Sequence, residues 1–323
     1  MDGTGGGKRA VVALGGNAII REGEEGRIDQ QFRNTRISLS GVVRLIKEGW
    51  EVLITHGNGP QVGNRLLSNE MAHEMVPNLP LGVLCGDTEG AMGYMIQQSL
   101  VNKLIYHSIK SSVVTVITQT EVDIDDMSMR NPTKPIGPFY SKEESEKLER
   151  EEGWRFVEDS GRGYRQVVPS PYPIDIIEID VIKSLLGMGV IVIALGGGGI
   201  PVMRQPDGTL EGVDGIIDKD LASSLAGRKI GASLFVMVTG VEKVALNYGK
   251  PNQKNIDKMT VSEAVGYLDG GHFPPGSMGP KIRAAVEFLE GGEGGEGSGV
   301  IITSPEGLSG AVFGGAGTTI VKD

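Results

Sequence analysis

Short apolar runs that end at glycine-rich turns recur along this chain and constrain its fold more than any other feature. Residues 10–14 (AVVAL) run into Gly15 and Gly16, and residues 51–55 (EVLIT) run into HGNGP at 56–60. Between these runs, from about residue 29 to residue 48, apolar side chains recur with the i, i+3, i+4, i+7 spacing of an amphipathic helix. The order strand, helix, strand predicts parallel strands that are buried on both faces.

The same alternation continues to the end of the chain and predicts an α/β fold with a mostly parallel sheet covered on both faces. The further elements we expect are a helix from Pro60, a strand at 113–118, a helix near 175–186, a strand at 190–195, a helix near 218–228, a strand at 234–239, a helix near 281–290, and the runs 300–303 and 318–321, which follow the same pattern. The charged, proline-rich segment 123–172 breaks this rhythm and predicts a small subdomain that projects from the sheet. GGEGGEGSG at 291–299 is typical of a flexible surface loop without a chemical role.

Composition excludes several classes of protein. The chain has 323 residues and a net charge of −10, which argues against a nucleic-acid surface because such a surface needs a dominant basic face. Its single cysteine, Cys85, has no partner for an internal disulfide or a cysteine metal cluster, which favours a reducing compartment. No stretch approaches the ~20 apolar residues of a membrane span, and no secretory signal opens the chain. We therefore expect a cytoplasmic protein that binds neither nucleic acid nor membrane.

Four glycine-rich turns follow directly on apolar runs, at 15–17, 56–60, 196–201 and 239–240. In open parallel sheets, ligands bind at the carboxyl ends of the strands, where glycine lets backbone N–H groups approach phosphates. Any one of these turns alone could simply reverse the chain, but Pro60 is well placed to begin a helix whose N-terminus attracts an anion. The chain contains no GxxxxGK[ST], HExxH or GxSxG pattern, so P-loop, zinc-protease and serine-hydrolase chemistry lack support.

Three lysines lie in compact settings beside proline, glycine or aspartate: Lys134 in NPTKP, Lys219 in IDKD and Lys281 in GSMGPK. Phosphoryl transfer needs positive charge on the transferring group and good positioning, with little acid or base chemistry. Asp218 and Asp220 flank Lys219 where a helix begins. They could cap that helix, or they could orient lysines or help to hold magnesium.

The motifs VVALGGNAI, THGNGPQVG, NPTKPIGPFY, GGGGIPV, GVDGIIDKDLAS and HFPPGSMGPKIRAA, taken together, resemble the carbamate kinases, a branch of the amino acid kinase family. The resemblance covers nearly the whole chain. It implies a three-layer αβα sandwich with a mainly parallel, about eight-stranded open sheet, a protruding subdomain at about 123–172, and usually a homodimer. In such enzymes the N-terminal lobe, here about 1–188, binds carbamate, and the C-terminal lobe, here about 189–323, binds ATP with magnesium. The reaction is reversible, yields ADP and carbamoyl phosphate, and often runs toward ATP.

The resemblance also implies roles for individual residues. Lys134, Lys219 and Lys281 would stabilise charge on the transferring group, with Asp220 or Asp218 orienting them. The residues that would bind carbamate and the phosphoryl group are Gly15, Gly16, Asn17, Gly57, Asn58 and Gly59. Those that would bind the nucleotide are Gly197, Gly198, Thr239, Val241, Val244, Tyr248, Gly276, Ser277, Met278 and Gly279. No protein ligand is assigned to magnesium, which the ATP phosphates would mainly hold.

The sequence departs from the family pattern at Glu89 in GDTEGAMGY, where many relatives carry glutamine. We expect either an extra negative charge or a surface variation there, without loss of activity. Two other functions stay open: an amino acid kinase that phosphorylates a larger carboxylate or phosphonate, and a nucleotide-binding regulator that has lost catalysis. The direction of the reaction and the pathway (arginine fermentation, purine breakdown or carbamoyl phosphate supply) are open as well.

Overall fold

An eight-stranded sheet forms the centre of the molecule in the computed structural model, which describes residues 7–21, 23–159, 163–274, 277–291 and 297–323. The strands lie in the order β15 (Lys258–Thr260), β17 (Thr318–Val321), β16 (Gly299–Thr303), β12 (Leu234–Val238), β1 (Arg9–Leu14), β2 (Glu51–His56), β9 (Ile191–Ile193) and β3 (Val113–Thr115). Every neighbouring pair is parallel except β16 and β17, which are antiparallel. The prediction of a mainly parallel, about eight-stranded sheet is confirmed.

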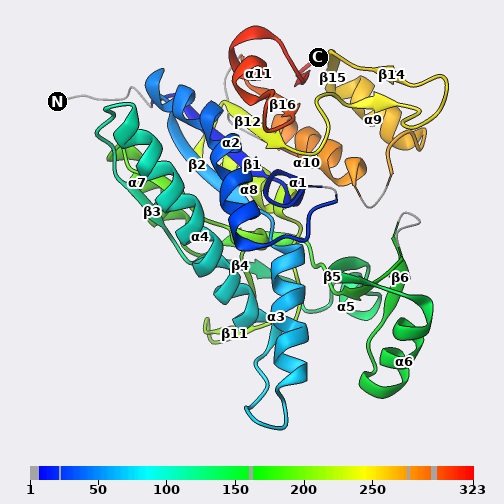
Figure 1. Ribbon diagram of the computed structural model, residues 1–323. Helices are drawn as coiled ribbons and strands as arrows, with labels where there is room; N and C mark the ends of the chain where they lie inside the picture. The colour runs from blue at the N-terminus through cyan, green and yellow to red at the C-terminus, as the bar shows by residue number, and fades with distance from the viewer. Residues whose placement is uncertain (1–6, 22, 160–162, 275–276, 292–296) are drawn as a thin grey trace.

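Two layers of helices cover this sheet (Figure 1). On one face, Val11 and Ala13 of β1 share a core with α7 (Ile179–Gly187), α8 (Lys219–Ile230), α9 (Val261–Asp269) and α10 (Met278–Gly291). On the other face, Val12 and Leu14 share a core with α2 (Ile28–Lys47), α4 (Leu81–Tyr106) and α11 (Leu308–Gly314). Because successive side chains of a strand point to opposite faces, a continuous apolar run such as β1 serves both cores. The fold is therefore the predicted three-layer αβα sandwich.

The strand register brings the glycine-rich turns to one edge of the sheet. Leu14, the last residue of β1, lies opposite both His56 of β2 and Val238 of β12. The ladder continues one step into the turns, because the Gly57 N–H donates to the Leu14 carbonyl at 2.9 Å and the Gly15 N–H donates to the Val238 carbonyl at 2.8 Å. The turns therefore begin at the same level, as the sequence predicts for parallel strands.

Two smaller sheets extend the molecule beyond the central sheet. A four-stranded sheet has the order β11 (Leu210–Gly212), β10 (Ile200–Arg204), β4 (Gln119–Val122) and β8 (Pro173–Ile176). A three-stranded sheet has the order β5 (Lys134–Tyr140), β7 (Tyr164–Val168) and β6 (Phe156–Glu158), with α5 (Met127–Arg130) and α6 (Lys142–Glu152) beside it. Figure 1 shows the three-stranded sheet and α6 standing to one side of the central sheet. A two-stranded ribbon pairs β13 (Ala245–Leu246) with β14 (Lys254–Asn255).

The three-stranded sheet is joined to the body by close packing on α3 (Gly59–Met71). A Cβ atom at Gly63 of α3 would lie 2.0 Å from both the Cα and the N atom of Gly137 in β5. Gly137 itself has a φ of +71°, which favours glycine. The two backbones therefore touch at a point where neither residue can carry a side chain, and this contact fixes β5 beside the helix that follows HGNGP.

Three sequence predictions differ from the structure. The strand expected at 113–118 ends at Thr115, and the helix expected near 175–186 begins only at Ile179, because residues 173–176 pair with β4 as β8. The run at 318–321 was expected to follow the parallel pattern, but Thr318 lies opposite Ile302 in an antiparallel ladder. The connection through α11 starts and ends at the same edge of the sheet, so the returning strand must run in the opposite direction. Within the described residues, no helix is long and apolar enough to cross a membrane.

Candidate active site

Three lysines from separate elements converge on two aspartates at the N-terminus of α8. The Lys219 Nζ lies 2.5 Å from Oδ1 of Asp220, and the Lys281 Nζ lies 2.7 Å from Oδ2 of the same carboxylate. The Lys134 Nζ, which reaches in from β5, lies 2.6 Å from Oδ2 of Asp218. The structure thus brings together all three lysines that the sequence singled out, although they lie up to 147 positions apart.

Each aspartate combines a local and a long-range contact. Asp218 is the N-cap of α8, and its Oδ1 accepts a hydrogen bond from the Asp220 N–H at 2.9 Å, while its other oxygen binds Lys134. The capping and the orienting interpretations of Asp218 therefore hold together. Each carboxylate oxygen of Asp220 accepts a hydrogen bond from one lysine, so the two ammonium groups are fixed on either side of one carboxylate.

Burial makes this cluster electrostatically strong. Burial alone would raise the pKa of Asp220, but the charges of Lys219 and Lys281 outweigh it, and the pKa of Asp220 is lowered. Burial lowers the pKa of Lys219, against the attraction of Asp220. Burial also acts to lower the pKa of Lys281, but the hydrogen bond and charge of Asp220 together with the charge of Asp218 outweigh it, and the pKa of Lys281 is raised. We assign all three groups to their charged forms at neutral pH, because each ammonium shares a short hydrogen bond with the ionised carboxylate. With Lys134 and Asp218 included, three positive charges face two negative charges, so the cluster has a net charge of +1 and favours an anionic ligand.

The two N-terminal glycine turns lie against this cluster. A Cβ atom on Gly57 would be 3.4 Å from Cδ of Lys219 and 3.5 Å from the backbone N of Gly16. A Cβ atom on Gly16 would meet nothing within 4 Å, so this backbone faces open space. Asn58 is the N-cap of α3, and its side-chain amide donates to Oγ1 of Thr88 at 2.9 Å. Backbone N–H groups at helix N-termini attract anions, and here they lie beside the lysines.

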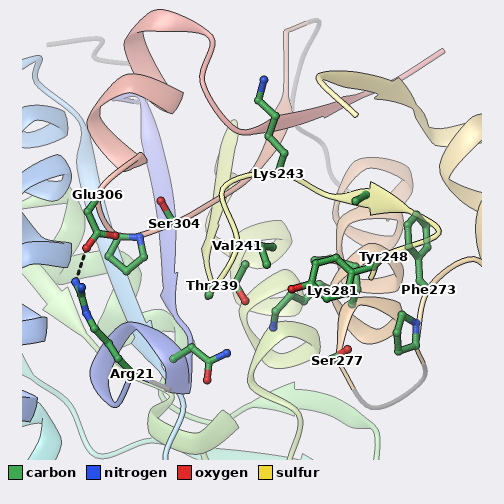
Figure 2. Close-up of a pocket in the computed structure, with 16 residues that line it drawn as sticks. Arg21, Thr239, Val241, Lys243, Tyr248, Phe273, Ser277, Lys281, Ser304 and Glu306 are labelled. Carbon is green, nitrogen blue, oxygen red and sulfur yellow. Dashed lines mark hydrogen bonds and ion pairs between the residues drawn. The ribbon is translucent and has the colours of Figure 1, made fainter. Parts of the chain in front are cut away.

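A cavity of about 470 Å³ opens beside the cluster, within the range of small-molecule and cofactor sites. Figure 2 shows Lys281 in the middle of its lining, with Tyr248 and Phe273 on one side and an ion pair between Arg21 and Glu306 on the other. Of the predicted residues, seven line it: Asn17, Thr239, Val241, Tyr248, Ser277, Met278 and Lys281. Apolar side chains and a few polar groups suit a flat base with a charged tail.

Other predicted nucleotide residues lie elsewhere. Gly197 and Gly198 form the short 3-10 turn η1 (Gly196–Gly198), and Gly197 packs against the Asn58 amide instead of lining the cavity. Val244 is fully buried, and its N–H donates to Oγ1 of Thr318. Gly279 is buried within α10 behind the lining residues. Gly276, like residues 292–296 of the predicted glycine-rich loop, falls outside the described residues.

Sequence reasoning missed several residues of the cavity wall. The resemblance also implies that residues 239–251 border the adenine and ribose, and that stretch includes Gly240, Lys243 and Ala245. The lining residues that no sequence prediction covers are Arg21, Phe273, Pro274, Ser304, Pro305 and Glu306. Ser304, Pro305 and Glu306 directly follow β16, so the rule that placed the other turns at the carboxyl ends of strands would have found them. Arg21 lies four residues after Asn17, and nothing in its local sequence indicates that it reaches Glu306.

The structure corrects the sequence interpretation of Glu89 and shows a second buried titratable side chain, His56. Glu89 was expected to add charge or to vary at the surface, but it is 1% exposed, so the surface interpretation is wrong. His56 is also 1% exposed, and burial lowers its pKa to about 4, with a hydrogen bond to the Gly57 carbonyl opposing the shift and the Lys219 charge adding to it. His56 is therefore neutral at pH 7 and is held in a buried position at the end of β2.

No set of three or more histidine, cysteine, aspartate or glutamate side chains among the described residues could hold a metal ion. The two carboxylates of the cluster, Asp218 and Asp220, are already bound to lysines.

A buried lysine cluster, glycine turns at helix N-termini and a cavity of about 470 Å³ on one edge of an αβα sandwich are features typical of an enzyme that transfers phosphoryl groups. Comparison with known proteins agrees, because the model of the amino acid kinase family matches residues 8–303. A carbamate kinase from Thermococcus kodakarensis is 44% identical over 98% of this chain and 100% of its own length. A carbamate kinase-like protein of Escherichia coli, YahI, is 46% identical over 97% of this chain and 98% of its own length.

Solved structures lead to the same group. Carbamate kinase from Giardia lamblia bound to citric acid matches with a TM-score of 0.92 at 40% identity, covering 98% of this chain and 99% of that one. The same Giardia enzyme bound to AMP-PNP matches with a TM-score of 0.88 at 41% identity over the same shares of both chains. The chain belongs to the amino acid kinase family and, within that family, to the carbamate kinases.

Proposed function

We propose that this chain catalyses the reversible transfer of the γ-phosphoryl group of ATP to carbamate, giving ADP and carbamoyl phosphate. The observation that carries the proposal is the convergence of Lys134, Lys219 and Lys281 on Asp218 and Asp220, beside both glycine turns. Such a cluster offers fixed positive charge where negative charge gathers in the transition state. The carbamate kinase relatives supply the acceptor, because the geometry alone does not distinguish carbamate from another small carboxylate.

The proposed reaction is a direct in-line transfer. A carbamate oxygen attacks the γ-phosphorus, a new P–O bond forms to carbamate, and the bond between the γ-phosphorus and the β–γ bridging oxygen breaks with its electron pair leaving on ADP. Carbamate is already an anion, so no proton has to be removed from the nucleophile and no general base is needed. A buried His56 that is neutral at pH 7 agrees with this requirement.

Each part of the site has a distinct task in this proposal. Lys219 and Lys281 are each held by one oxygen of Asp220, and they stabilise the negative charge on the transferring group. Lys134 approaches the same group from β5. The N–H groups of Gly15 and Gly57 already donate to the carbonyls of Val238 and Leu14, so these two glycines contribute close backbone approach and not a donor. The backbone N–H groups that cradle carbamate and the phosphoryl group in this proposal are those of Gly16, Asn17, Asn58 and Gly59. Bringing two anions together costs electrostatic energy, which a site of net positive charge offsets at short range.

The cavity is the proposed site of ATP and ADP, with the base beside Tyr248 and Phe273 and the phosphates toward Lys281. The Giardia relative bound to AMP-PNP supports a nucleotide ligand. Magnesium would enter with the nucleotide, held mainly by its phosphates, and would reduce the negative charge that the lysines must balance. In this division the lobe at about 1–188, with the projecting part at about 123–172, binds carbamate, and the lobe at about 189–323 binds the nucleotide.

We extend the proposal to the assembly and setting of the protein. Exposed apolar side chains on α4, among them Tyr94 and Ile105, lie near the edge strand β3 and support a homodimer formed through that face. The buried free thiol of Cys85 and the acidic composition support a cytoplasmic enzyme that contacts no nucleic acid and no membrane. Carbamoyl phosphate links such an enzyme to arginine metabolism, with ATP formation as the favoured direction.

Acceptor competition tests this function. The purified protein is given ATP and magnesium with carbamate, supplied by ammonium and bicarbonate, or with a larger carboxylate such as N-acetylglutamate, and ADP release is measured. The proposal predicts turnover with carbamate and none above background with the larger acid. Turnover with the larger acid alone would assign the enzyme to another branch of the family, and ATP binding without turnover on any acceptor would indicate a regulator that has lost catalysis.

A further inference from the structure

Glu89 is a buried carboxyl group that the proposed reaction leaves without a role. It lies on α4 with 1% of its surface exposed. Its Oε2 accepts a hydrogen bond from the Thr118 N–H at 2.9 Å, and the Gly196 N–H also acts on the carboxyl group. Among the described residues, Oε1 meets no partner with hydrogen-bond geometry. A buried carboxyl oxygen without a partner is costly, so its retention beside the active-site turns needs an explanation.

Thr118 links Glu89 to the glycine turn that follows β9 through two hydrogen bonds. The Oγ1 atom of Thr118 accepts a hydrogen bond from the Leu195 N–H at 3.1 Å, and Leu195 is held in the left-handed region with a φ of +56°. A leucine in this conformation persists only where its surroundings hold it there. Leu195 is the N-cap of η1, so the link from Glu89 through Thr118 fixes the start of that turn.

The turn itself is clamped between Glu89 and the end of β2. A Cβ atom on Gly196 would lie 2.8 Å from Cγ of Glu89 and 2.6 Å from Cε1 of His56, so the two side chains enclose this glycine. The next residue, Gly197, has a φ of +65°, and a Cβ atom there would lie 2.2 Å from Nδ2 of Asn58. The turn that Glu89 positions is thus the surface against which the Asn58 amide rests.

Helix α4 holds Asn58 from a second side as well. Thr88, the residue before Glu89, accepts the hydrogen bond from Asn58 Nδ2. Two consecutive residues of one helix therefore determine where Asn58 lies, one directly and one through Thr118, Leu195 and the glycine turn. Asn58 occupies the N-cap position of α3, which begins at Gly59. A shift of Asn58 would therefore move the N–H groups at the start of α3 that are proposed to bind carbamate.

The charges around Glu89 disfavour its ionised form. Glu178, at the N-cap of α7, accepts a hydrogen bond from the Gln119 N–H at 2.7 Å and places a second carboxylate nearby. His56 is neutral, and burial raises the pKa of the Cys85 thiol to about 12, so neither supplies a positive charge. Burial raises the pKa of Glu89 well above 4.5, and repulsion by Glu178 adds to this shift, whereas the N–H groups of Thr118 and Gly196 oppose it without cancelling it.

We propose that Glu89 is a positioning residue for phosphoryl transfer and that it works as the neutral carboxylic acid, holding Thr118 and the glycine turn in the arrangement that supports Asn58. The inference rests on the proposed function, since the turn it positions belongs to the proposed carbamate site. The neutral acid keeps one acceptor oxygen for Thr118 without placing a negative charge behind an anion site. Ionisation at high pH adds that charge and loosens the turn.

The test compares Glu89→Gln, Glu89→Leu and the wild type, with Asp87→Asn as the matched control. Asp87 lies on the same helix two residues earlier and is exposed, so Asp87→Asn removes a carboxylate without touching the network. ATP formation from ADP and carbamoyl phosphate is measured from neutral to alkaline pH, and each variant is expressed as a ratio to wild type so that ionisation of the substrates cancels. Glu89→Gln should match wild type at neutral pH and exceed it increasingly at alkaline pH, whereas the Asp87→Asn ratio stays flat.

Glu89→Leu removes the acceptor and should lower kcat by at least ~10-fold, since small displacements of a binding group already cost that much. A constant Glu89→Gln ratio across the pH range would overturn the neutral-acid claim, and wild-type kcat in Glu89→Leu would overturn the positioning claim. If Glu89→Leu does not fold, the pH dependence of the activity ratio between Glu89→Gln and wild type still tests whether Glu89 works as the neutral acid.

Unfolding measured against pH separates this inference from the proposed function. A group whose pKa is raised on folding stabilises fully below its unfolded value and loses that contribution as the pH rises. Wild type should therefore lose stability relative to Glu89→Gln from about pH 4.5 upward, and Asp87→Asn should not reproduce this difference. If no protein shows carbamate kinase activity but this difference is present, the function fails while the buried neutral acid stands. If activity is present and the difference is absent, the inference alone fails.

Discussion

Replacing Asp220 by asparagine perturbs the lysine cluster at the carboxylate that two lysines share. The side chain keeps its size and one acceptor oxygen, but it loses the negative charge between Lys219 and Lys281. Both hydrogen bonds are charge-assisted and buried, since Asp220 is 3% exposed and Lys219 is 8% exposed. The net charge of the cluster rises from +1 to +2, and one ammonium group loses its acceptor.

The expected loss of stability follows from this geometry. Removing one partner of a buried ion pair lowers the free energy of unfolding by about 3–5 kcal/mol. Because asparagine keeps one acceptor oxygen, we expect a loss at the lower end of this range, about 3 kcal/mol. That value corresponds to roughly 10²-fold in the folding equilibrium. Because the lysines also lose their fixed positions, turnover should fall by about 10²-fold or more. A bound triphosphate brings compensating negative charge, so the loss of stability should shrink when magnesium and AMP-PNP are present.

Urea unfolding and initial rates of ATP formation measure the two effects, with Asp87→Asn as the control for the same chemical change at an exposed position of α4. Acid titration adds a third readout. The pKa of Asp220 is lowered below 3.8 on folding, so its contribution to stability is present above that pH and is lost as the pH falls. Asp220→Asn should lack this part of the acid-induced loss. Wild-type turnover and wild-type stability in Asp220→Asn would refute the role assigned to the cluster.

Three further substitutions test separate parts of the structure. Lys134→Ala should lower turnover by at least ~10²-fold while nucleotide binding, measured by calorimetry, stays near wild type, and a near-normal rate would remove Lys134 from the mechanism. The free energy of unfolding of the wild type should fall by about 3 kcal/mol between pH 6.5 and pH 4, because His56 takes up a proton in the unfolded chain but stays neutral in the folded protein. In urea titrations, His56→Gln should lack this pH dependence of stability. Gly63→Ala forces the backbone of Gly137 away from α3, so it should cost about 1–3 kcal/mol in thermal unfolding and lower kcat, and unchanged values in both assays would contradict the packing described.

The fold could be predicted from the sequence because its signals are local. Apolar runs such as 10–14 and 234–238 and the intervening helical periodicity specify buried parallel strands between two helical layers. The direction of β17 could not be predicted in this way, since a run of four residues carries no information about its partner. The second sheet was missed for a related reason: β8 and β4 are short, and their pairing joins segments about 50 residues apart.

The candidate site also combines residues that the sequence identifies with contacts that only the structure shows. Lysines in rigid, glycine- or proline-rich settings stand out in the sequence, so Lys134, Lys219 and Lys281 could be named before the structure. Which aspartate holds which lysine depends on long-range packing, and only the structure shows that Asp220 takes two and Asp218 takes one. The same holds for Glu89, whose burial depends on the turn after β9 and not on its neighbours in the chain.

The family resemblance contributed the acceptor, which no residue pattern specifies. Carbamate differs from other small carboxylates by one amino group, and the described side chains near the glycine turns do not by themselves identify that group. The geometry instead supports the reaction class, through fixed positive charge beside a nucleotide-sized cavity.

The most direct test of the central claim is ATP formation from ADP and carbamoyl phosphate by the purified wild-type protein and by Lys219→Ala, with magnesium and with the metal chelated. The account predicts rapid, magnesium-dependent ATP formation by wild type and a rate at least ~10²-fold lower in Lys219→Ala. No ATP from the wild type, although ADP binds, would contradict the assignment of carbamoyl phosphate as substrate. Equal rates from both proteins would contradict the role of the lysine cluster.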